Sequence, residues 1–450
     1  MSAEADGAAV RSGGDSLARG LLRGGAVALG IKVGAAGLSF LTFLVLARVT
    51  SLEDFGRIGF GVSLAGALGV VGSYGQRALV LRYAPAYASD GDARRRRGLL
   101  RFGYAAVAAG CGALGAALVA FDLFWPGLET RGPIAMAGLL TLALGVAEYQ
   151  VYALRSLAGL VLSQAPRDLL WRLLAIAAAA PFLLDGARRL SATEALGLLA
   201  LALVVVTVLQ AALHPATRPR ELLRARGTWE SSEWTRVSRT LWGVSVVNVA
   251  GPNSTVVVAG LLLSPEATGM LFAAMRLAAL LDLIPMAAQM AISKIISRMW
   301  HENDREGVAR VYAIAAAIAA GPALLGVAGF ALLGRWLLSL FGAEFAEAWP
   351  LLMILSVGFL VKALAGPAVL ILQFAGREGR LMRAIGVANL SSMALVVAAT
   401  PAYGALGAAA ASALGPAASA LWALRLSRTS LGIDTSILAP LRRRLRRAAP

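Results

Sequence analysis

Five cationic side chains fall inside long apolar stretches of the sequence, where a charge is costly: Lys32, Arg77, Arg172, Arg276 and Lys362. One such side chain at the centre of a bilayer costs about 2.5–3.5 kcal/mol on insertion scales, so it usually faces a wet cavity or a partner of opposite charge. Attraction to an anion such as a diphosphate is poorly screened in a low-dielectric site. We therefore predict that four of these residues bind an anionic substrate, namely Lys32, Arg77, Arg276 and Lys362.

Arg172 has a simpler explanation, because Asp168 lies one helical turn before it and an i,i+4 ion pair would account for it locally. Two other carboxylates are candidates for ion coupling, Asp282 deep in an apolar run and Glu148 near the inner end of another. Asp282 lies about 120° around a helix from Arg276, so the two should not pair within it. Asp282 is expected either to titrate, as in proton relays, or to form a fixed ion pair with another helix.

Twelve apolar runs must position these side chains. About 20 apolar residues are needed to cross a bilayer as a helix. Residues 198–203 are apolar at every position, which favours helices over the alternating strands of a barrel. The sequence predicts an all-α integral membrane fold with spans at 24–47, 58–81, 102–125, 133–154, 167–185, 193–213, 240–263, 270–293, 309–333, 350–374, 380–400 and 404–425. Candidate kinks are Pro252, Pro285, Pro322 and Pro367.

The composition supports this class. Of the 450 residues, 58% are hydrophobic and only 15% are charged, against about 25% charged residues in soluble domains. A net charge of +17 would suggest nucleic-acid binding in a soluble chain. Here the arginines lie between the apolar runs, so no nucleic-acid partner is expected. Two histidines and one cysteine make a metal site improbable, no phosphate-binding loop is present, and no cofactor is expected.

The basic residues between the runs alternate in number from one side to the other. By our count, 31 of the 42 Lys and Arg residues fall in loops on one side and six on the other. Cytoplasmic loops concentrate Lys and Arg, so both termini are predicted to be cytoplasmic, in an inner (plasma) membrane. The expected parts are a disordered cytoplasmic tail at 1–20, an N-lobe of six spans at 21–213, a cytoplasmic linker at 214–239, a C-lobe of six spans at 240–426 and a basic cytoplasmic tail at 427–450. The linker is expected to be either an interfacial helix on the inner leaflet or a solvated connection.

The two predicted lobes share a short motif. Residues 51–56 follow the first run, residues 264–269 follow the seventh, and both read Ser-x-Glu-x-x-Gly. Six spans separate the two segments, which implies parallel repeats related by an axis along the membrane normal. Two similar six-helix lobes around a central cavity are typical of a transporter rather than of a membrane enzyme.

Several further segments carry a resemblance to a known family. They are residues 46–56 (LARVTSLEDFG), 340–345 (LFGAEF), 375–378 (AGRE) and 403–409 (YGALGAA). In order and spacing these segments resemble the polysaccharide (O-antigen-type) flippases of the multidrug/oligosaccharidyl-lipid/polysaccharide exporter superfamily. Such flippases often carry an Asp-Arg pair in the seventh span, whereas residues 251–255 read GPNST here.

The resemblance implies a flippase rather than an enzyme. It would move a polyprenyl-diphosphate-linked oligosaccharide from the inner to the outer leaflet by alternating access, for export of a surface polysaccharide. We expect a monomer whose partners are the lipid-linked oligosaccharide, membrane lipids and a polysaccharide polymerase or ligase.

Three alternatives stay open. An ion-coupled multidrug antiporter of the same superfamily would favour acidic and aromatic residues in its cavity. A peptidoglycan-precursor flippase usually has fourteen spans rather than twelve. A membrane enzyme that processes glycans would need a large periplasmic loop or a catalytic acidic cluster, and neither is evident.

Overall fold

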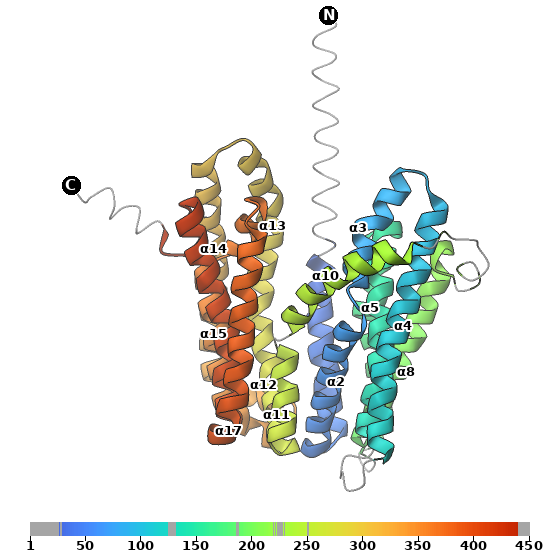
Figure 1. The fold of residues 1–450 in the computed structure, drawn as a ribbon. Coiled ribbons are helices and arrows are strands. Elements are labelled where there is room, and N and C mark those ends of the chain that lie inside the picture. Colours follow the sequence, from blue (N-terminus) through green and yellow to red (C-terminus); the bar gives the residue numbers. More distant parts are fainter. Residues whose placement is uncertain are drawn as a thin grey trace, which may run out of the picture.

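The computed structural model describes residues 29–124, 132–185, 189–218, 230–249 and 252–439, together with Val27, Arg220, Leu222 and Thr228. Within these residues all regular structure is helical. The helices form two bundles, coloured blue to green and yellow to red in Figure 1, which lie close together at one end and splay apart toward the other. The predicted tail at 1–20 and residues 440–450 of the predicted tail at 427–450 lie outside the described residues.

The first bundle, the N-lobe, begins with a helix at Leu29–Val49. The elements that follow are α2 (Leu52–Gly72), α3 (Gln76–Ser89), α4 (Ala93–Phe124), α5 (Pro133–Ala158), α6 (Leu160–Ala165), a π-helical turn η1 (Pro166–Leu170), α7 (Trp171–Asp185), α8 (Ala192–Leu213) and η2 (Pro215–Thr217). The capping box at Ser191 and Glu194 fixes the start of α8, because each side chain satisfies a backbone N–H of the other residue.

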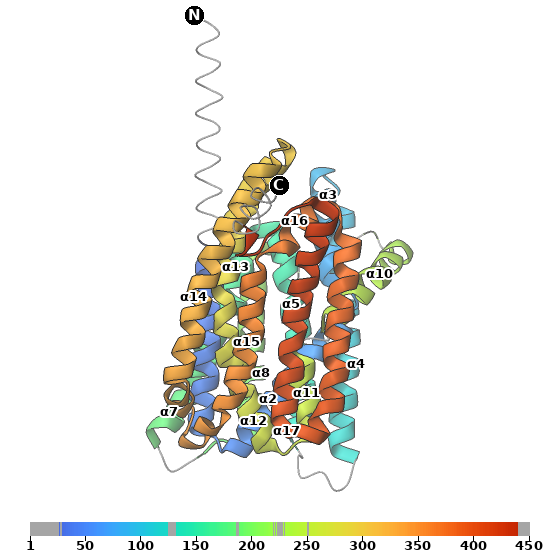
Figure 2. The ribbon, with the colours of Figure 1, turned by 90° about the vertical axis from the view of Figure 1, so that its left-hand side faces the viewer.

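The C-lobe follows the connecting helix α10 (Ser231–Val249). Its elements are α11 (Pro252–Leu262), α12 (Pro265–Ala278), η3 (Ala279–Asp282), α13 (Leu283–His301), α14 (Arg305–Ser339), η4 (Ala343–Ala348), α15 (Trp349–Ala365), α16 (Ala368–Phe374) and α17 (Glu378–Leu431). Figure 2 shows α14, α15 and both arms of α17 running side by side along the lobe.

The predicted membrane fold is confirmed. Nine helical segments in the described residues are long and apolar enough to cross a membrane. One of them, α17, turns back at Gly404, whose backbone is not helical (φ 59°, ψ −144°), and therefore supplies two crossings. The run α6–η1–α7 and the shorter α11 supply two more. The described residues are thus all-α and make twelve crossings, six in each lobe.

Two predicted spans are broken by backbone turns, and their boundaries were wrong. The predicted span 58–81 is interrupted at Tyr74 and Gly75, both with positive φ, where α2 ends and α3 begins. The predicted span 350–374 is interrupted at Gly366 (φ 73°), between α15 and α16. Hydropathy misses both breaks, because apolar residues soon resume after each one, at 78–81 and at 368–372.

The start of helix α10 holds the last part of the predicted linker, residues 231–239, against the N-lobe. The indole of Trp234 is fully buried and donates to the Tyr87 hydroxyl at 3.2 Å, and Gln76 donates to Ser238 at 3.0 Å. Farther along, Trp242 donates to the Val71 carbonyl. The predicted seventh span at 240–263 is divided between the end of α10 and α11, so α10 lies obliquely across the lobe in Figure 1 rather than crossing as one rod.

The two lobes cross closely at α2 and α12. A Cβ atom on Gly56 would lie 1.7 Å from the Pro265 carbonyl oxygen, and one on Gly269 would lie 3.0 Å from the Leu52 carbonyl oxygen. Ser51 and Ser264 cap these two helices in the same way, each accepting from the N–H three residues on. The Ser-x-Glu-x-x-Gly repeat therefore marks equivalent helix starts that meet at the lobe interface.

The chain after α17 packs against the end of α15 and extends beyond the predicted lobe boundary at 426. The Thr435 hydroxyl donates to the Ala365 carbonyl at 3.1 Å, and the Ile437 N–H donates to the Leu364 carbonyl at 3.2 Å. Burial raises the pKa of Asp434, but hydrogen bonds from Ser436 and Arg428 outweigh it and hold the pKa below its usual value. We call residues 432–439 the C-terminal strap, since it satisfies carbonyls that the end of a helix leaves unpaired.

Candidate functional site

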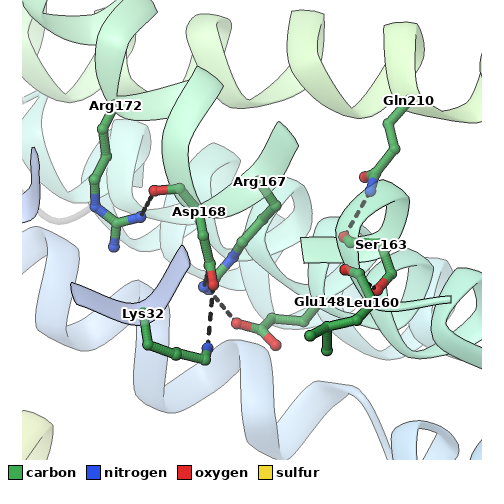
Figure 3. Close-up of polar contacts among 8 residues, drawn as sticks. All are labelled: Lys32, Glu148, Leu160, Ser163, Arg167, Asp168, Arg172 and Gln210. Atoms are coloured by element: carbon green, nitrogen blue, oxygen red, sulfur yellow. Dashed lines mark hydrogen bonds and ion pairs between the residues drawn. The ribbon is translucent and has the colours of Figure 1, made fainter. Parts of the chain in front are cut away.

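Four cations and two carboxylates gather inside the N-lobe, and we call them the N-lobe network: Lys32, Arg77, Glu148, Arg167, Asp168 and Arg172. Asp168 accepts from Lys32 at 3.1 Å and from Arg167 at 2.8 Å. Glu148 pairs with Arg167 and lies 3.8 Å from Arg77. Figure 3 shows Lys32 of the first helix, Glu148 of α5, and Arg167 and Asp168 of η1 converging, with Arg172 of α7 beside Asp168. Asp168 is only 6% exposed, whereas Lys32 is 39% exposed, so the network is most open at Lys32.

The π-helical turn η1 is the element that builds the network. Five residues occupy a widened turn that begins at Pro166, immediately after the short α6. The wider turn brings the consecutive side chains Arg167 and Asp168 to a common ion pair. Arg172 was predicted to pair with the Asp168 carboxylate, but this was wrong: Arg172 donates to the Asp168 backbone carbonyl at 2.6 Å, and Lys32 and Arg167 take the carboxylate.

Arg167 is the residue that sequence reasoning missed. It was counted among the loop cations because it opens the predicted fifth span. In the structure it holds both carboxylates of the network, and its side chain is 21% exposed. The sequence signal that could have identified Arg167 is its position between Pro166 and the carboxylate Asp168.

A second polar site lines a cavity of about 480 Å³ in the C-lobe, which we call the C-lobe cavity. Lys362 and Asp282 form an ion pair in its wall, with Nζ 2.8 Å from the nearer carboxylate oxygen. The two side chains are 40% and 35% exposed, respectively. The prediction that Asp282 pairs with a cation on another helix rather than with Arg276 is confirmed in its geometry. Other polar lining residues are Ser63, Asn253, Thr255, Asn389, Ser392, Ser412 and Ser419.

Backbone breaks position this pair. Asp282 ends the 3-10 turn η3, where α12 gives way to α13 shortly before the predicted kink at Pro285. Lys362 lies three residues before the end of α15, so its predicted position in the middle of a span was wrong. The helix ends at Gly366 and Pro367 rather than continuing to 374, which brings the lysine near a helix terminus.

Arg276 lies between the two lobes. Its guanidinium carbon is 4.7 Å from the ring centre of Phe43 and 4.5 Å from that of Phe272. Its Nε is buried and has no hydrogen-bond partner in the structure. Cation–π contacts of this kind stabilise a charge by about 0.5–2 kcal/mol, so the aromatic rings hold Arg276 at the wall of the C-lobe cavity, where it also lines the space.

The four predicted substrate-binding cations do not share one cavity. Arg276 and Lys362 line the C-lobe cavity, whereas Lys32 and Arg77 belong to the N-lobe network. The two predicted coupling carboxylates are likewise divided, with Asp282 in the cavity and Glu148 in the network. Each lobe therefore carries its own set of cations and carboxylates.

Aromatic rings and one arginine hold the two lobes together at the end of the molecule where α2 crosses α12. Phe55 packs against Phe272, Phe341 and Phe345 of the C-lobe, with ring centres 5.7, 6.2 and 5.3 Å away. Arg48, at the end of the first helix, donates to the carbonyls of Leu340 and Ser339, the latter at 3.2 Å. We call these contacts the closed-end seal, because each joins one lobe to the other.

Comparison with solved structures shows which known fold this chain has. Neither the protein-family models nor the curated proteins compared with this sequence give a match. Among solved structures, an inward-facing multidrug-resistance MATE transporter of the MOP superfamily aligns with a TM-score of 0.70 and 14% identity, over 88% of this chain and 94% of its own. The chain has the fold of the MOP-superfamily transporters. The lipid II flippase MurJ, in an inward closed conformation, aligns with a TM-score of 0.68 and 13% identity, over 90% of this chain and 87% of MurJ.

A MATE transporter in the outward-facing conformation fits this chain less well. An outward-facing MATE transporter of the superfamily gives a TM-score of only 0.57 at 14% identity, although the alignment covers 92% of this chain and 95% of that one. The difference between 0.70 and 0.57 agrees with the contacts above, which join the lobes at the α2–α12 end. In this MOP fold, then, one end is sealed while the lobes diverge at the other.

Proposed function

We propose that this chain is a flippase that moves a polyprenyl-diphosphate-linked oligosaccharide from the inner to the outer leaflet by alternating access. The observation that carries the proposal is an excess of cations at both polar sites. Among the described residues, four cations accompany two carboxylates in the N-lobe network, and two cations accompany one carboxylate at the C-lobe cavity. Both sites keep a positive balance after their internal pairing.

A positive balance favours an anionic substrate over a cationic one. At an effective dielectric constant of about 20, a unit charge about 5 Å from another interacts by roughly 3 kcal/mol. That interaction would attract a diphosphate and would repel a cationic drug by a similar amount. The multidrug antiporter has the same fold and remains the competing function, but it gains nothing from the cations at either site.

Asp282 and Glu148 are the proposed coupling residues. Asp282 holds Lys362 at the wall of the C-lobe cavity, with Nζ 2.8 Å from the carboxylate. A proton or another cation arriving at Asp282 would weaken this pair and release Lys362 for the phosphate. In the N-lobe, Glu148 would act in the same way on Arg77, which lies at its weaker contact of 3.8 Å.

The direction of transport follows from the predicted orientation. The side on which the lobes diverge also holds the α3–α4 and α13–α14 turns, which the charge distribution assigns to the cytoplasm (Figure 1). Substrate would enter from that side, and the closed-end seal would have to part before release to the outer leaflet.

Transport in proteoliposomes tests the proposal directly. The purified chain would be assayed for translocation of a fluorescent polyprenyl-diphosphate oligosaccharide and, separately, for efflux of a cationic dye. Lys32→Ala and Lys362→Ala should each lower lipid translocation about tenfold or more, because one lost contact of 1.4 kcal/mol is a factor of ten. Arg310→Ala, which removes an exposed cation near the start of α14, is the matched control and should transport normally.

The two substrates separate the two functions. Dye efflux without lipid translocation would replace the flippase by the antiporter. Loss of surface glycan in a deletion strain, restored by the native chain and not by Lys362→Ala at equal expression, would support the flippase in cells.

A further inference from the structure

A cavity of about 720 Å³ opens on the flank of the N-lobe, away from both polar sites. It lies between α4, α5 and α8, with η2 and Leu222 at one end. Apolar or small residues form most of its wall, and Arg101 is the charged residue among them. The lining residues are Arg101, Tyr104, Ala105, Val146, Gln150, Thr207, Val208, Ala211, Ala212, Thr217 and Leu222.

The cavity faces the bilayer. Its wall includes Val208, which is 63% exposed and lies five residues before the end of the spanning helix α8. Exposed apolar side chains on a membrane span contact hydrocarbon rather than water. An indentation in such a surface is therefore filled by lipid chains.

The cavity is separate from the proposed transport path. Gln150 lines it, whereas Glu148, two residues earlier on α5, belongs to the N-lobe network. Two residues correspond to about 200° around a helix, so the two side chains leave α5 on opposite faces. The helix itself stands between the cavity and the network.

The polar groups inside the cavity are already bonded to protein. The Tyr104 hydroxyl donates to Gln150 at 3.2 Å. The Gln150 amide donates to the Thr207 carbonyl at 2.8 Å and to Gln210 at 3.1 Å. A sugar would find few polar partners here, whereas an acyl chain needs only the apolar wall.

The mouth of the cavity is basic. Arg101 lies eight residues into α4, about 12 Å along the helix from its start. Its Nε donates to the Leu222 carbonyl, which fixes the guanidinium at the edge of the cavity. The four arginines at 94–97 lie one to two turns closer to the helix start. Clusters of this kind at a membrane surface attract anionic lipid by about 1 kcal/mol per residue.

We propose that this cavity binds an anionic phospholipid. One acyl chain lies along the wall formed by Ala105, Val208 and Ala212, and the headgroup phosphate contacts Arg101. The apolar wall explains why a lipid fits, and the arginines select its charge. The site lies outside the proposed substrate path, so it does not depend on the transported molecule.

Native mass spectrometry of the purified full-length chain tests the site. The protein in detergent would be titrated with phosphatidylglycerol and with phosphatidylcholine of the same acyl chains. The wild type should bind phosphatidylglycerol at least fivefold more tightly, as expected for about one charge contact. Arg101→Gln should remove this preference and leave binding of phosphatidylcholine unchanged.

Two further variants complete the test. Ala105→Trp fills the cavity from an exposed position, so it should weaken binding of both lipids without affecting folding. Arg310→Gln removes one exposed charge from the C-lobe and should behave as the wild type. Equal affinity of the wild type for the two lipids, or unchanged phosphatidylglycerol binding in Arg101→Gln or in Ala105→Trp, would overturn the proposal.

Discussion

At the scale of single residues, Lys362 and Asp282 set the charge of the C-lobe cavity. Lys362→Ala leaves Arg276 and Asp282 to cancel each other, whereas Lys362→Ala combined with Asp282→Ala restores a positive balance. If the balance governs substrate binding, lipid translocation should fall about tenfold in the single variant and recover at least in part in the double variant. If Asp282 is needed for ion coupling, the double variant should stay inactive but regain substrate binding. Translocation and binding assays on both variants distinguish these outcomes, and no recovery of either would contradict the charge argument.

Arg167 is expected to matter more for stability than Lys32, although both contact Asp168. Arg167 is 21% exposed and joins two carboxylates, whereas Lys32 is 39% exposed and joins one. Removing one partner of a buried pair costs about 3–5 kcal/mol, and removing an exposed partner costs about 1 kcal/mol or less. Thermal unfolding in detergent should therefore show a larger loss for Arg167→Gln than for Lys32→Gln. Equal losses would mean that η1 does not organise the network.

At the scale of elements, the crossing of α2 and α12 requires glycine at position 56. The added Cβ of Gly56→Ala would lie 1.7 Å from the Pro265 carbonyl oxygen, a contact that the backbone can relieve only by separating the helices. We expect this variant to favour a state with an open seal. The readout is labelling of Phe341→Cys, a fully buried position at the seal, by a membrane-impermeant thiol reagent.

The same labelling has a built-in control. Gly37→Ala adds the same methyl group to the first helix, where no atom lies within 4 Å of the new Cβ. Labelling of Phe341→Cys in the Gly37→Ala background should therefore stay low. The native Cys111 is buried and should contribute little background. Equal labelling of the Gly56 and Gly37 variants would show that the crossing does not control the seal.

The elements also show what the sequence could and could not predict. Span number and order were predictable, because twelve apolar runs and alternating basic loops carry that information locally. The depth of Lys362 was not, because residues 368–374 stay apolar after the chain breaks at Gly366 and hydropathy does not register a change of φ. The role of Arg167 depends on which carboxylates the folded chain brings to it. Asp282 was identified as one member of a pair, but its partner required the packing of α15 beside η3.

At the scale of the whole molecule, the orientation in the membrane can be tested with two exposed turns. Glu302 lies in the turn between α13 and α14, on the side where the lobes diverge, and Glu344 lies in η4 beside the closed-end seal. With the predicted cytoplasmic termini, an impermeant thiol reagent added to intact cells should label Glu344→Cys and not Glu302→Cys. Labelling of Glu302→Cys should appear only after the membrane is permeabilised. The reverse pattern would invert the assignment of the two faces.

The paired glycines at the lobe crossing have a consequence for assembly. Gly56 lies against Pro265 and Gly269, and Gly269 lies against Leu52 and Gly56. Leu52 and Gly56 occupy the same positions in the first copy of the motif as Pro265 and Gly269 in the second, so the two helices meet through equivalent positions. Oligomer interfaces of this kind are isologous, the arrangement found in two-fold homodimers. We therefore expect two separately expressed lobes to associate with copies of themselves as well as with each other, which size-exclusion chromatography of each lobe alone would detect. In the intact chain, the connection through α10 joins one N-lobe to one C-lobe.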